Sequence, residues 1–435
     1  MISDSSLMEK IISLCRRRGF VFPGSEIYGG LANSWDFGPL GVELKNNIKE
    51  QWWRWFVRSR NDVVGVDTAI IMNPKVWEAS GHLKEFVDLV AECKKCQLRL
   101  RADQLRKTNC PACDLKLPVP RRFNLLFKTF VGPAEDSASV AYLRPETAQG
   151  MFVDFEKVVE VTRKKIPFGI AQVGKAFRNE ITPGNFIFRT REFEQMEIEY
   201  FVEAKSWRKH FNHWLTEMKK WLKHLGIKSK NLEYREIAKG ERAHYSQKTI
   251  DIFYKFPFGW EELYGLAYRG DYDLKNHRQT YRDPETNKQF LPHVIEPTWG
   301  VERSVLAALI EAYNEEQAPT AVKGETAVRV VMKFPHWLAP YKAAVLPLLP
   351  KPSLAKLARS VHKNLLPHFS CEYDETQSIG RRYRRQDEIG TPFCVTVDFD
   401  SLKDKSVTIR GRDTMKQERL PINQLTAFLE DQCKS

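Results

Sequence analysis

The spacing of apolar residues predicts several helices and strands along this chain. Over residues 39–58 apolar side chains recur at helical spacing, which predicts an amphipathic helix. The same spacing predicts helices over 206–225 and 354–366. An apolar run between the first two helices, VVGVDTAIIMNP, predicts β-structure that ends at Pro74.

Two long strands are predicted in the middle of the chain. Residues 168–180 and 192–201 flank a loop with the turn signal TPGN, which predicts a long antiparallel hairpin. Successive side chains of a strand point to opposite faces of its sheet. On the second strand the mostly apolar face holds Glu194, Met196, Ile198 and Tyr200, and the polar face holds Phe193, Gln195, Glu197 and Glu199.

Arginines cluster just before this polar face, at Arg178, Arg189 and Arg191. Arginines beside carboxylates suit a triphosphate with a cationic substrate nearby, although a plain charged surface would also explain them. A second sequence feature that favours anion binding follows a predicted strand that ends at Gly300. Arg303 lies there in the first turn of a predicted helix, and a helix N-terminus favours an anion. This second signal is weak alone.

The chain is long enough for two or three domains. A polar segment with Pro319, about 314–326, predicts a linker. Beyond it, strands at 328–334 and 393–399 alternate with the helix at 354–366, which predicts a small α/β domain. We therefore expect a catalytic domain over 1–320 and a second domain over 326–435.

Composition favours a soluble globular protein, with 42% hydrophobic and 28% charged residues among 435. The net charge is +13, and residues 326–435 hold 18 Lys/Arg against 12 Asp/Glu. This excess suits a polyanionic partner or ordinary solubilising charge. No apolar run reaches the roughly 18–20 residues of a membrane span. The N-terminal Arg cluster follows its apolar stretch, the wrong order for a secretory signal, so we expect a cytoplasmic protein.

Four of the eight cysteines form one constellation, Cys93-x2-Cys96-x13-Cys110-x2-Cys113. Two CxxC pairs can bring four thiolates to one ion, and four sulfur ligands with no open position are typical of structural zinc. Coincidental pairs or a redox pair are the alternatives. The other cysteines are scattered singly, as inert thiols are in a reducing compartment.

Several segments together resemble the homodimeric glycyl-tRNA synthetases, a family of class II aminoacyl-tRNA synthetases. The resemblance runs from about residue 5 to 430. Three segments resemble the class II motifs: the helix and strand ending at Pro74, the hairpin with FRNE (177–180) and FRTREFEQMEIEYF (188–201), and Gly300-x-x-Arg303. Three further segments resemble the glycyl-tRNA synthetases more specifically than the other class II families: YGGLANSWDFGPLG (28–41), YLRPETAQG (142–150) and RRYRRQDEIGTPFCVTVDF (381–399).

The resemblance implies an α+β fold. An antiparallel catalytic sheet flanked by helices would carry a zinc-binding insertion at about 90–123, and a C-terminal α/β domain would bind the anticodon. It implies a ligase that activates glycine with ATP and Mg²⁺ and transfers it to the 3′ end of tRNA(Gly). It also implies a homodimer built on motif 1, with structural Zn²⁺ and no membrane partner.

The resemblance implies a nucleotide site around motifs 2 and 3. Arg178 would hold the α-phosphate, Arg303 the γ-phosphate, and Phe193 would stack on adenine. Glu180 is implied as catalytic with the two arginines, and Glu262 as the magnesium contact. The implied ATP-binding residues are Arg178, Asn179, Glu180, Phe188, Arg189, Thr190, Arg191, Glu192, Phe193, Glu262, Leu263, Gly300, Val301, Glu302 and Arg303.

The resemblance also implies a pocket for glycine, in which Glu146, Glu197 and Glu296 surround the ammonium group. Thr298 stands where the family generally has Ser, which keeps the hydroxyl and adds a methyl group. The implied substrate residues are Arg101, Glu146, Phe193, Glu194, Gln195, Met196, Glu197, Glu296, Pro297, Thr298, Trp299 and Gly300.

Two other functions fit parts of the sequence. A non-catalytic relative on the same fold need not retain the activating residues, yet Arg178, Glu180, Phe193 and Arg303 are all present. A zinc-ribbon RNA-binding module would explain the cysteines and the basic charge, but not the three motifs. Every competing amino acid is larger than glycine, so a pocket that glycine fills excludes the competitors by steric overlap. We therefore expect no editing domain.

Overall fold

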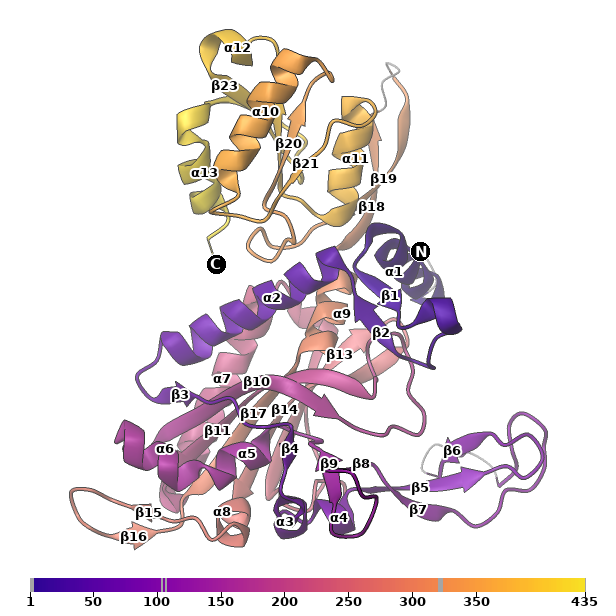
Figure 1. Ribbon diagram of the computed structural model, residues 1–435, viewed down its shortest axis with the longest axis vertical. Helices are drawn as coiled ribbons and strands as arrows, with labels where there is room; N and C mark the ends of the chain where they lie inside the picture. The colour runs from indigo at the N-terminus through magenta and orange to yellow at the C-terminus, as the bar shows by residue number, and fades with distance from the viewer. Residues whose placement is uncertain (1–3, 103–104, 106–107, 320–323, 435) are drawn as a thin grey trace.

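A computed structural model describes residues 4–102, 105, 108–319 and 324–434. Figure 1 shows two bodies stacked along the long axis of the molecule, with a slender arm on the larger one. The larger body holds residues up to about 312, and the smaller one holds residues from about 343 on. Residues 313–332 lie beside the smaller body, and the segment around 334–339 packs into the larger one.

A seven-stranded sheet forms the centre of the larger body, in the order β12-β13-β14-β17-β11-β10-β3. Its pairs are antiparallel except that β3 runs parallel to β10 at one edge. The predicted hairpin is confirmed as its β10–β11 pair. The bounds are β3 Val63–Gly65, β10 Phe168–Phe177, β11 Glu192–Val202, β12 Leu232–Glu236, β13 Lys248–Phe256, β14 Gly259–Gly270 and β17 His293–Gly300.

The two faces of this sheet bury different clusters. Met196, Ile198 and Tyr200 on β11 lie in the main core, whereas Phe201 points to a second cluster on the opposite face. The alternation predicted from the sequence is therefore confirmed. The main core receives α1 Asp4–Arg18, α2 Pro39–Trp53, α7 Trp207–His224 and α9 Val301–Ala312, and the second receives α5 Ala148–Val153, α6 Phe155–Thr162 and α8 Tyr272–Asn276.

Short elements complete the larger body. The predicted helix over 39–58 continues beyond α2 as a π-helical turn, Arg54–Arg58. The short strands and α-helices are β1 Val21–Pro23, β2 Trp35–Phe37, β4 Ile71–Met72, α3 Pro74–Ala79, α4 His82–Glu85, β8 Phe127–Phe130, β9 Val140–Leu143, β15 Tyr281–Arg282 and β16 Gln289–Phe290.

The arm in Figure 1 is the Cys-containing segment. Its three-stranded sheet has the order β6-β5-β7, built from β5 Val87–Glu92, β6 Arg99–Arg101 and β7 Arg121–Asn124. It is an excursion between α4 and β8, at the position of the insertion that the family resemblance implies.

The smaller body is a five-stranded sheet in the order β21-β20-β22-β23-β24. Its first three strands are parallel and the last two antiparallel, and the predicted helix at 354–366 is confirmed as α10. The bounds are β20 Ala343–Pro347, α10 Pro352–Leu365, β21 Cys371–Tyr373, α11 Ile379–Ile389, β22 Phe393–Val397, α12 Ser401–Asp404, β23 Ser406–Gly411, β24 Gln417–Pro421 and α13 Leu425–Gln432.

The prediction of a linker over 314–326 is wrong for the first half of that segment. Residues 313–319 form strand β18 (Tyr313–Pro319), which pairs along its length with β19 (Thr326–Met332). Positions 320–323 lie outside the described residues. The strand predicted at 328–334 exists as β19, but it pairs with β18 rather than joining the C-terminal sheet. The polar composition of the segment reflects a two-stranded ribbon with few buried side chains.

Buried polar contacts join this ribbon to the C-terminal body. Arg329 on β19 is almost fully buried, and its Nε lies 2.8 Å from Asp387 on α11. Arg410 on β23 lies 2.9 Å from the same carboxylate. At the other end of the ribbon, Met332 packs into the main core of the larger body. The ribbon therefore packs against both bodies.

Candidate active site

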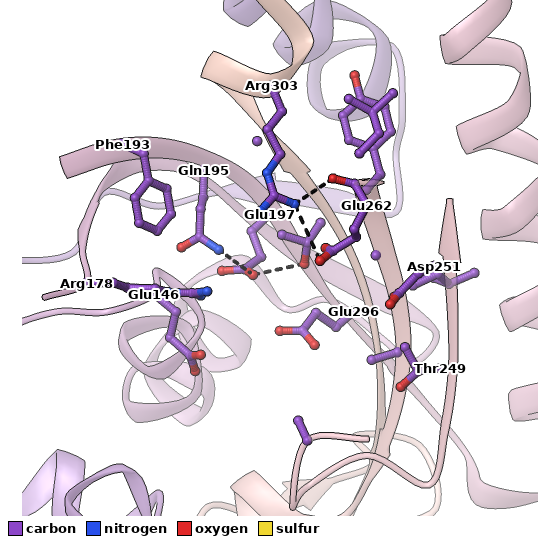
Figure 2. Close-up of a pocket in the computed structure, with 18 of the residues that line it drawn as sticks. Glu146, Arg178, Phe193, Gln195, Glu197, Thr249, Asp251, Glu262, Glu296 and Arg303 are labelled. Carbon is purple, nitrogen blue, oxygen red and sulfur yellow. Dashed lines mark hydrogen bonds and ion pairs between the residues drawn. The ribbon is translucent and has the colours of Figure 1, made fainter. Parts of the chain in front are cut away.

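A cavity of about 330 Å³ opens on the polar face of the sheet. Its walls come from β11, β13, β14 and β17, the loop between β10 and β11, and the start of α9. Figure 2 shows Arg303 at the top of this cavity and Arg178 at its left side, around the carboxylates of Glu146, Glu197 and Glu296.

Two arginines lie on the walls of the cavity. Arg178 follows the last residue of β10, donates from Nε to the Pro145 carbonyl at 3.0 Å, and stacks 5.3 Å from the ring centre of Phe193. Arg303, in the first turn of α9, donates to the Glu262 carbonyl at 2.7 Å and lies 4.4 Å over the Phe188 ring. A guanidinium carries several N–H donors in one plane, a geometry that suits phosphate oxygens.

The floor of the cavity is acidic. Glu146, Glu197 and Glu296 line it, and each is almost fully buried. Glu197 accepts hydrogen bonds from the Thr147 hydroxyl at 2.5 Å and from the Thr298 hydroxyl at 3.0 Å. A buried carboxylate group needs donors or cations, so this floor favours a positively charged ligand.

Arg269 is the cation that holds the floor together. It is fully buried, donates through two nitrogens to Asp273 at 2.7 and 2.8 Å, and donates to Glu296 at 2.6 Å. Its guanidinium carbon lies 3.6 Å from the ring centre of Tyr245. The acidic groups outnumber this cation, which leaves a deficit of positive charge in the cavity.

The surroundings shift the pKa of each floor carboxylate differently. Burial would raise the pKa of Glu146, but His82, whose Nε2 lies 3.2 Å away, and Arg269 hold that pKa below its usual range. Burial and the charge of Glu146 raise the pKa of Glu197. Burial raises the pKa of Glu296 well above its usual value, although Arg269 opposes the change. A cationic ligand would favour the ionised form of each group.

A second acidic pair lies beside Arg303. Its Nη1 is 3.4 Å from the Glu262 carboxylate, and Asp251 on β13 lies close by (Figure 2). Burial, followed by the charge of Glu262, raises the pKa of Asp251 to about 7. Carboxylates next to a phosphate site are the usual protein ligands of Mg²⁺.

Most residues predicted for substrate binding line this one cavity. They are Glu146, Arg178, Glu180, Phe188, Arg189, Thr190, Phe193, Gln195, Glu197, Glu262, Leu263, Glu296, Thr298, Gly300, Glu302 and Arg303. They come from segments that are far apart in the sequence, which the sheet brings together.

The other predicted substrate residues lie elsewhere. Glu194 points to the opposite face of β11, where its carboxylate lies 2.8 Å from Lys45. Arg101 lies in the arm, 3.2 Å from Asp88. Met196, Pro297, Trp299 and Val301 are buried away from the cavity, and Asn179, Arg191 and Glu192 line a neighbouring groove.

Several cavity residues were not predicted from the sequence. Thr249 and Asp251 alternate with apolar residues on β13, a period-2 signal that could have identified them. Tyr245 lies in a loop without such a signal. Arg269, which does not line the cavity itself, is the second-last residue of β14, and its importance depends on contacts with α8 and β17.

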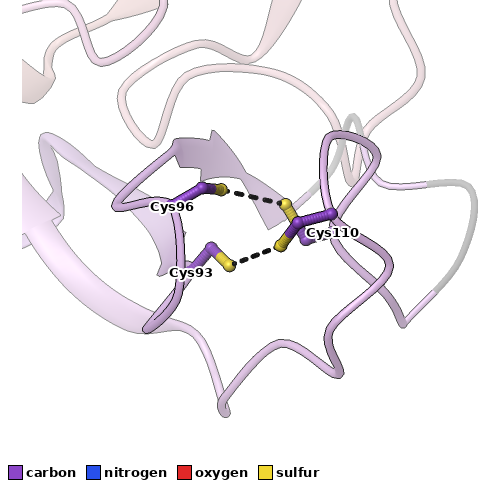
Figure 3. A group of neighbouring side chains, drawn as sticks. Cys93, Cys96 and Cys110 are labelled. Carbon is purple, nitrogen blue, oxygen red and sulfur yellow. Dashed lines mark hydrogen bonds between the residues drawn. The ribbon is translucent and has the colours of Figure 1, made fainter.

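The four predicted zinc ligands converge at the tip of the arm. Their sulfur atoms all lie within 4.8 Å of one another, with Cys93 3.4 Å from Cys113 and Cys96 3.5 Å from Cys110 (Figure 3). All four thiols are free. Tetrahedral zinc with bonds of about 2.3 Å holds its sulfurs slightly less than 4 Å apart, so the cluster is compatible with zinc.

Among the residues that the structure describes, no helix is both long and apolar enough to cross a membrane.

Comparison with known proteins identifies both bodies. Residues 130–313 match the tRNA synthetase class II core domain (G, H, P, S and T), and residues 342–432 match the anticodon binding domain. The chain is 51% identical to a glycine–tRNA ligase of Alkaliphilus oremlandii over the full length of both proteins. It is 52% identical to that of Geobacillus kaustophilus, with 98% of each chain covered, and 50% identical to that of Thermobifida fusca, with 99% covered. This chain therefore belongs to the glycine–tRNA ligase family of class II aminoacyl-tRNA synthetases.

Proposed function

We propose that this chain joins glycine to tRNA(Gly) in the cavity described above, in two steps. The observation that carries the proposal is the division of one cavity into a wall with two arginines and a floor of buried carboxylates. Such a cavity can hold a nucleotide phosphate beside a small cation with a carboxylate of its own. Glycine is the smallest amino acid of this kind.

The first step is attack by the glycine carboxylate on the α-phosphorus of ATP, which forms glycyl-adenylate and releases pyrophosphate. It needs no protein nucleophile, so positioning and charge stabilisation do the work. Arg178 would hold the α-phosphate with a bidentate guanidinium, and the ring of Phe193 beside it would stack on adenine. Arg303, at the N-terminus of α9, would hold the γ-phosphate.

Class II synthetases require magnesium, which would neutralise the β- and γ-phosphates of ATP. Glu262 is the residue best placed to hold it, since its carboxylate lies beside Arg303. Asp251 is a second candidate on the adjacent strand, because its raised pKa would fall on binding a cation.

The carboxylate floor would bind the glycine ammonium group, with Glu146, Glu197 and Glu296 around it. Thr298 donates to Glu197 and thereby fixes one of these carboxylates. Its methyl group would take up room that a larger amino acid needs. Larger amino acids would therefore be excluded because they overlap with the protein. Steric exclusion can discriminate by more than the roughly 1–3 kcal/mol that a missing methylene contributes.

The second step is attack by the terminal 3′-hydroxyl of the tRNA on the adenylate carbonyl, with AMP as the leaving group. The C-terminal body would bind the anticodon, and the positive charge beyond residue 326 suits that polyanionic partner. We place the catalytic domain at 1–320 and the anticodon-binding domain at 326–435, with ribbon β18–β19 across the boundary.

Amino-acid-dependent ATP–pyrophosphate exchange tests the proposal, with glycine, alanine, serine and threonine offered separately. We expect exchange with glycine alone. Exchange with none of them would favour a non-catalytic RNA-binding protein, and exchange with serine or threonine would reassign the amino acid.

We also propose zinc in the four-cysteine cluster and predict about one zinc per chain by elemental analysis. The double variant Cys93→Ser, Cys110→Ser should lose it, because two of four ligands are gone. A matched variant, Cys371→Ser, alters a thiol of the C-terminal core and should keep the metal. Metal-free wild-type protein, purified without chelators, would contradict the assignment.

A homodimer is the third part of the proposal. A groove beside α2 includes the apolar side chains of Trp35, Phe37 and Val42, and Ile27 and Tyr28 are 88% and 87% exposed. Exposed apolar surface of this kind marks protein interfaces. Sedimentation equilibrium should give twice the chain mass, and a monomer at micromolar concentration would count against it.

A further inference from the structure

Glu199 is a buried carboxyl group that the two steps above do not use. It lies on β11, two residues beyond Glu197 and on the same face of the sheet. Its side chain is fully buried, and neither of its oxygens has a hydrogen-bond partner among the described residues. Burying an ionised carboxylate without a partner is very costly.

The sheet places Glu199 directly across from Glu296. Glu197 pairs with Thr298 and Tyr200 with Ile295 in the β11–β17 register, so the residue opposite Glu199 is Glu296. One oxygen from each of Glu197, Glu199 and Glu296 lies within 4.8 Å of the others. Three buried carboxylates this close together do not all ionise.

The hydrogen-bond donors and cations near Glu199 contact its neighbouring carboxylates instead. Arg269 donates to Glu296 and, through two nitrogens, to Asp273. Glu197 accepts from two threonine hydroxyls. None of these donors reaches Glu199. Burial, followed by the charge of Glu296, raises the pKa of Glu199 well above its usual value.

We propose that Glu199 is a neutral carboxylic acid whose O–H donates to the Glu296 carboxylate and thereby positions it for the glycine ammonium group. The proposal rests on the function proposed above. The charged groups around Glu199 are Glu197 on its own strand, Glu296 on β17, Arg269 on β14 and Asp273 on α8. With Glu199 neutral, Glu146, Glu197 and Glu296 remain as the anions that receive glycine. Glu199 is a positioning residue, since it acts through Glu296.

Three variants test this role by steady-state exchange. Glu199→Gln keeps a donor and no charge, so we expect its KM for glycine to stay within about threefold of the wild-type value. Glu199→Leu removes the donor and should raise that KM by about tenfold or more, with the KM for ATP unchanged. Glu197→Gln is the matched control two residues away. It removes an ionised group, and its KM for glycine should also rise by about tenfold or more.

Infrared difference spectroscopy at neutral pH reads the proton directly. Wild-type protein should show the carbonyl band of a protonated carboxyl group, which Glu199→Gln removes and Glu197→Gln retains. This measurement does not depend on glycine activation, so it separates the proposal from the proposed function. The proposal is overturned if the band is absent, if Glu199→Gln is impaired as strongly as Glu197→Gln, or if Glu199→Leu binds glycine like wild type.

Discussion

Replacement of Arg178 by alanine is expected to lower the rate of glycine-dependent pyrophosphate exchange by about 100-fold or more, the effect of losing one donor to the transition state. The guanidinium is held by the Pro145 carbonyl on one side and by the Phe193 ring on the other. It is therefore ordered before substrate arrives. A preorganised donor contributes more to the rate than one that must be ordered during the reaction.

Lys175→Ala is the matched control for this experiment. Lys175 lies three residues earlier, on β10, but its side chain is half exposed and pairs with Glu192. Its loss should change exchange by less than about threefold, since exposed ion pairs contribute little. Near-normal exchange in Arg178→Ala would refute the role of Arg178. An equal fall in both variants would point to a damaged strand rather than a lost phosphate contact.

Replacement of Arg269 by methionine is expected to lower the free energy of unfolding by about 3–5 kcal/mol, as for one partner removed from a buried ion pair. Asp273 and Glu296 would lose the guanidinium that pairs with both, and both carboxylates are buried. The loss should be smaller in acid, where protonation neutralises the abandoned carboxylates. Urea denaturation at two pH values measures both effects.

Lys157→Met is the control for the second experiment. Lys157 pairs with Asp154 on the surface, and its side chain is 77% exposed. We expect a change below about 1 kcal/mol. If Arg269→Met were as stable as this control, Arg269 would not hold the floor together, and the carboxylates there would have to be neutral already.

Local patterns predicted much of the catalytic sheet and of the cavity. The alternation on β11 correctly separated Gln195 and Glu197, which line the cavity, from Met196 and Ile198, which lie in the core. The same alternation explains why Glu194 faces away from the cavity toward Lys45. The family resemblance assigned Glu194 to the glycine site, whereas the strand period places it on the other face.

The features that local patterns did not predict depend on distant partners. Strand β18 has a polar sequence, and only its pairing with β19 makes it a strand. Arg269 is one arginine among many in the sequence, and its role arises where β14, α8 and β17 meet. Glu199 was placed on the polar face correctly. Its lack of donors depends on which strand the fold sets beside it.

The contacts of the β18–β19 ribbon have a consequence for how substrates are told apart. Arg329 pairs with α11 of the smaller body and Met332 packs into the core of the larger one, so the ribbon is a packed junction between them rather than a loose linker. We expect the separation between the cavity and the anticodon-binding domain to vary little as a result. A tRNA whose arms are too long or too short cannot reach both ends at once, whatever its bases. The junction would in this way let the enzyme reject RNAs by their dimensions.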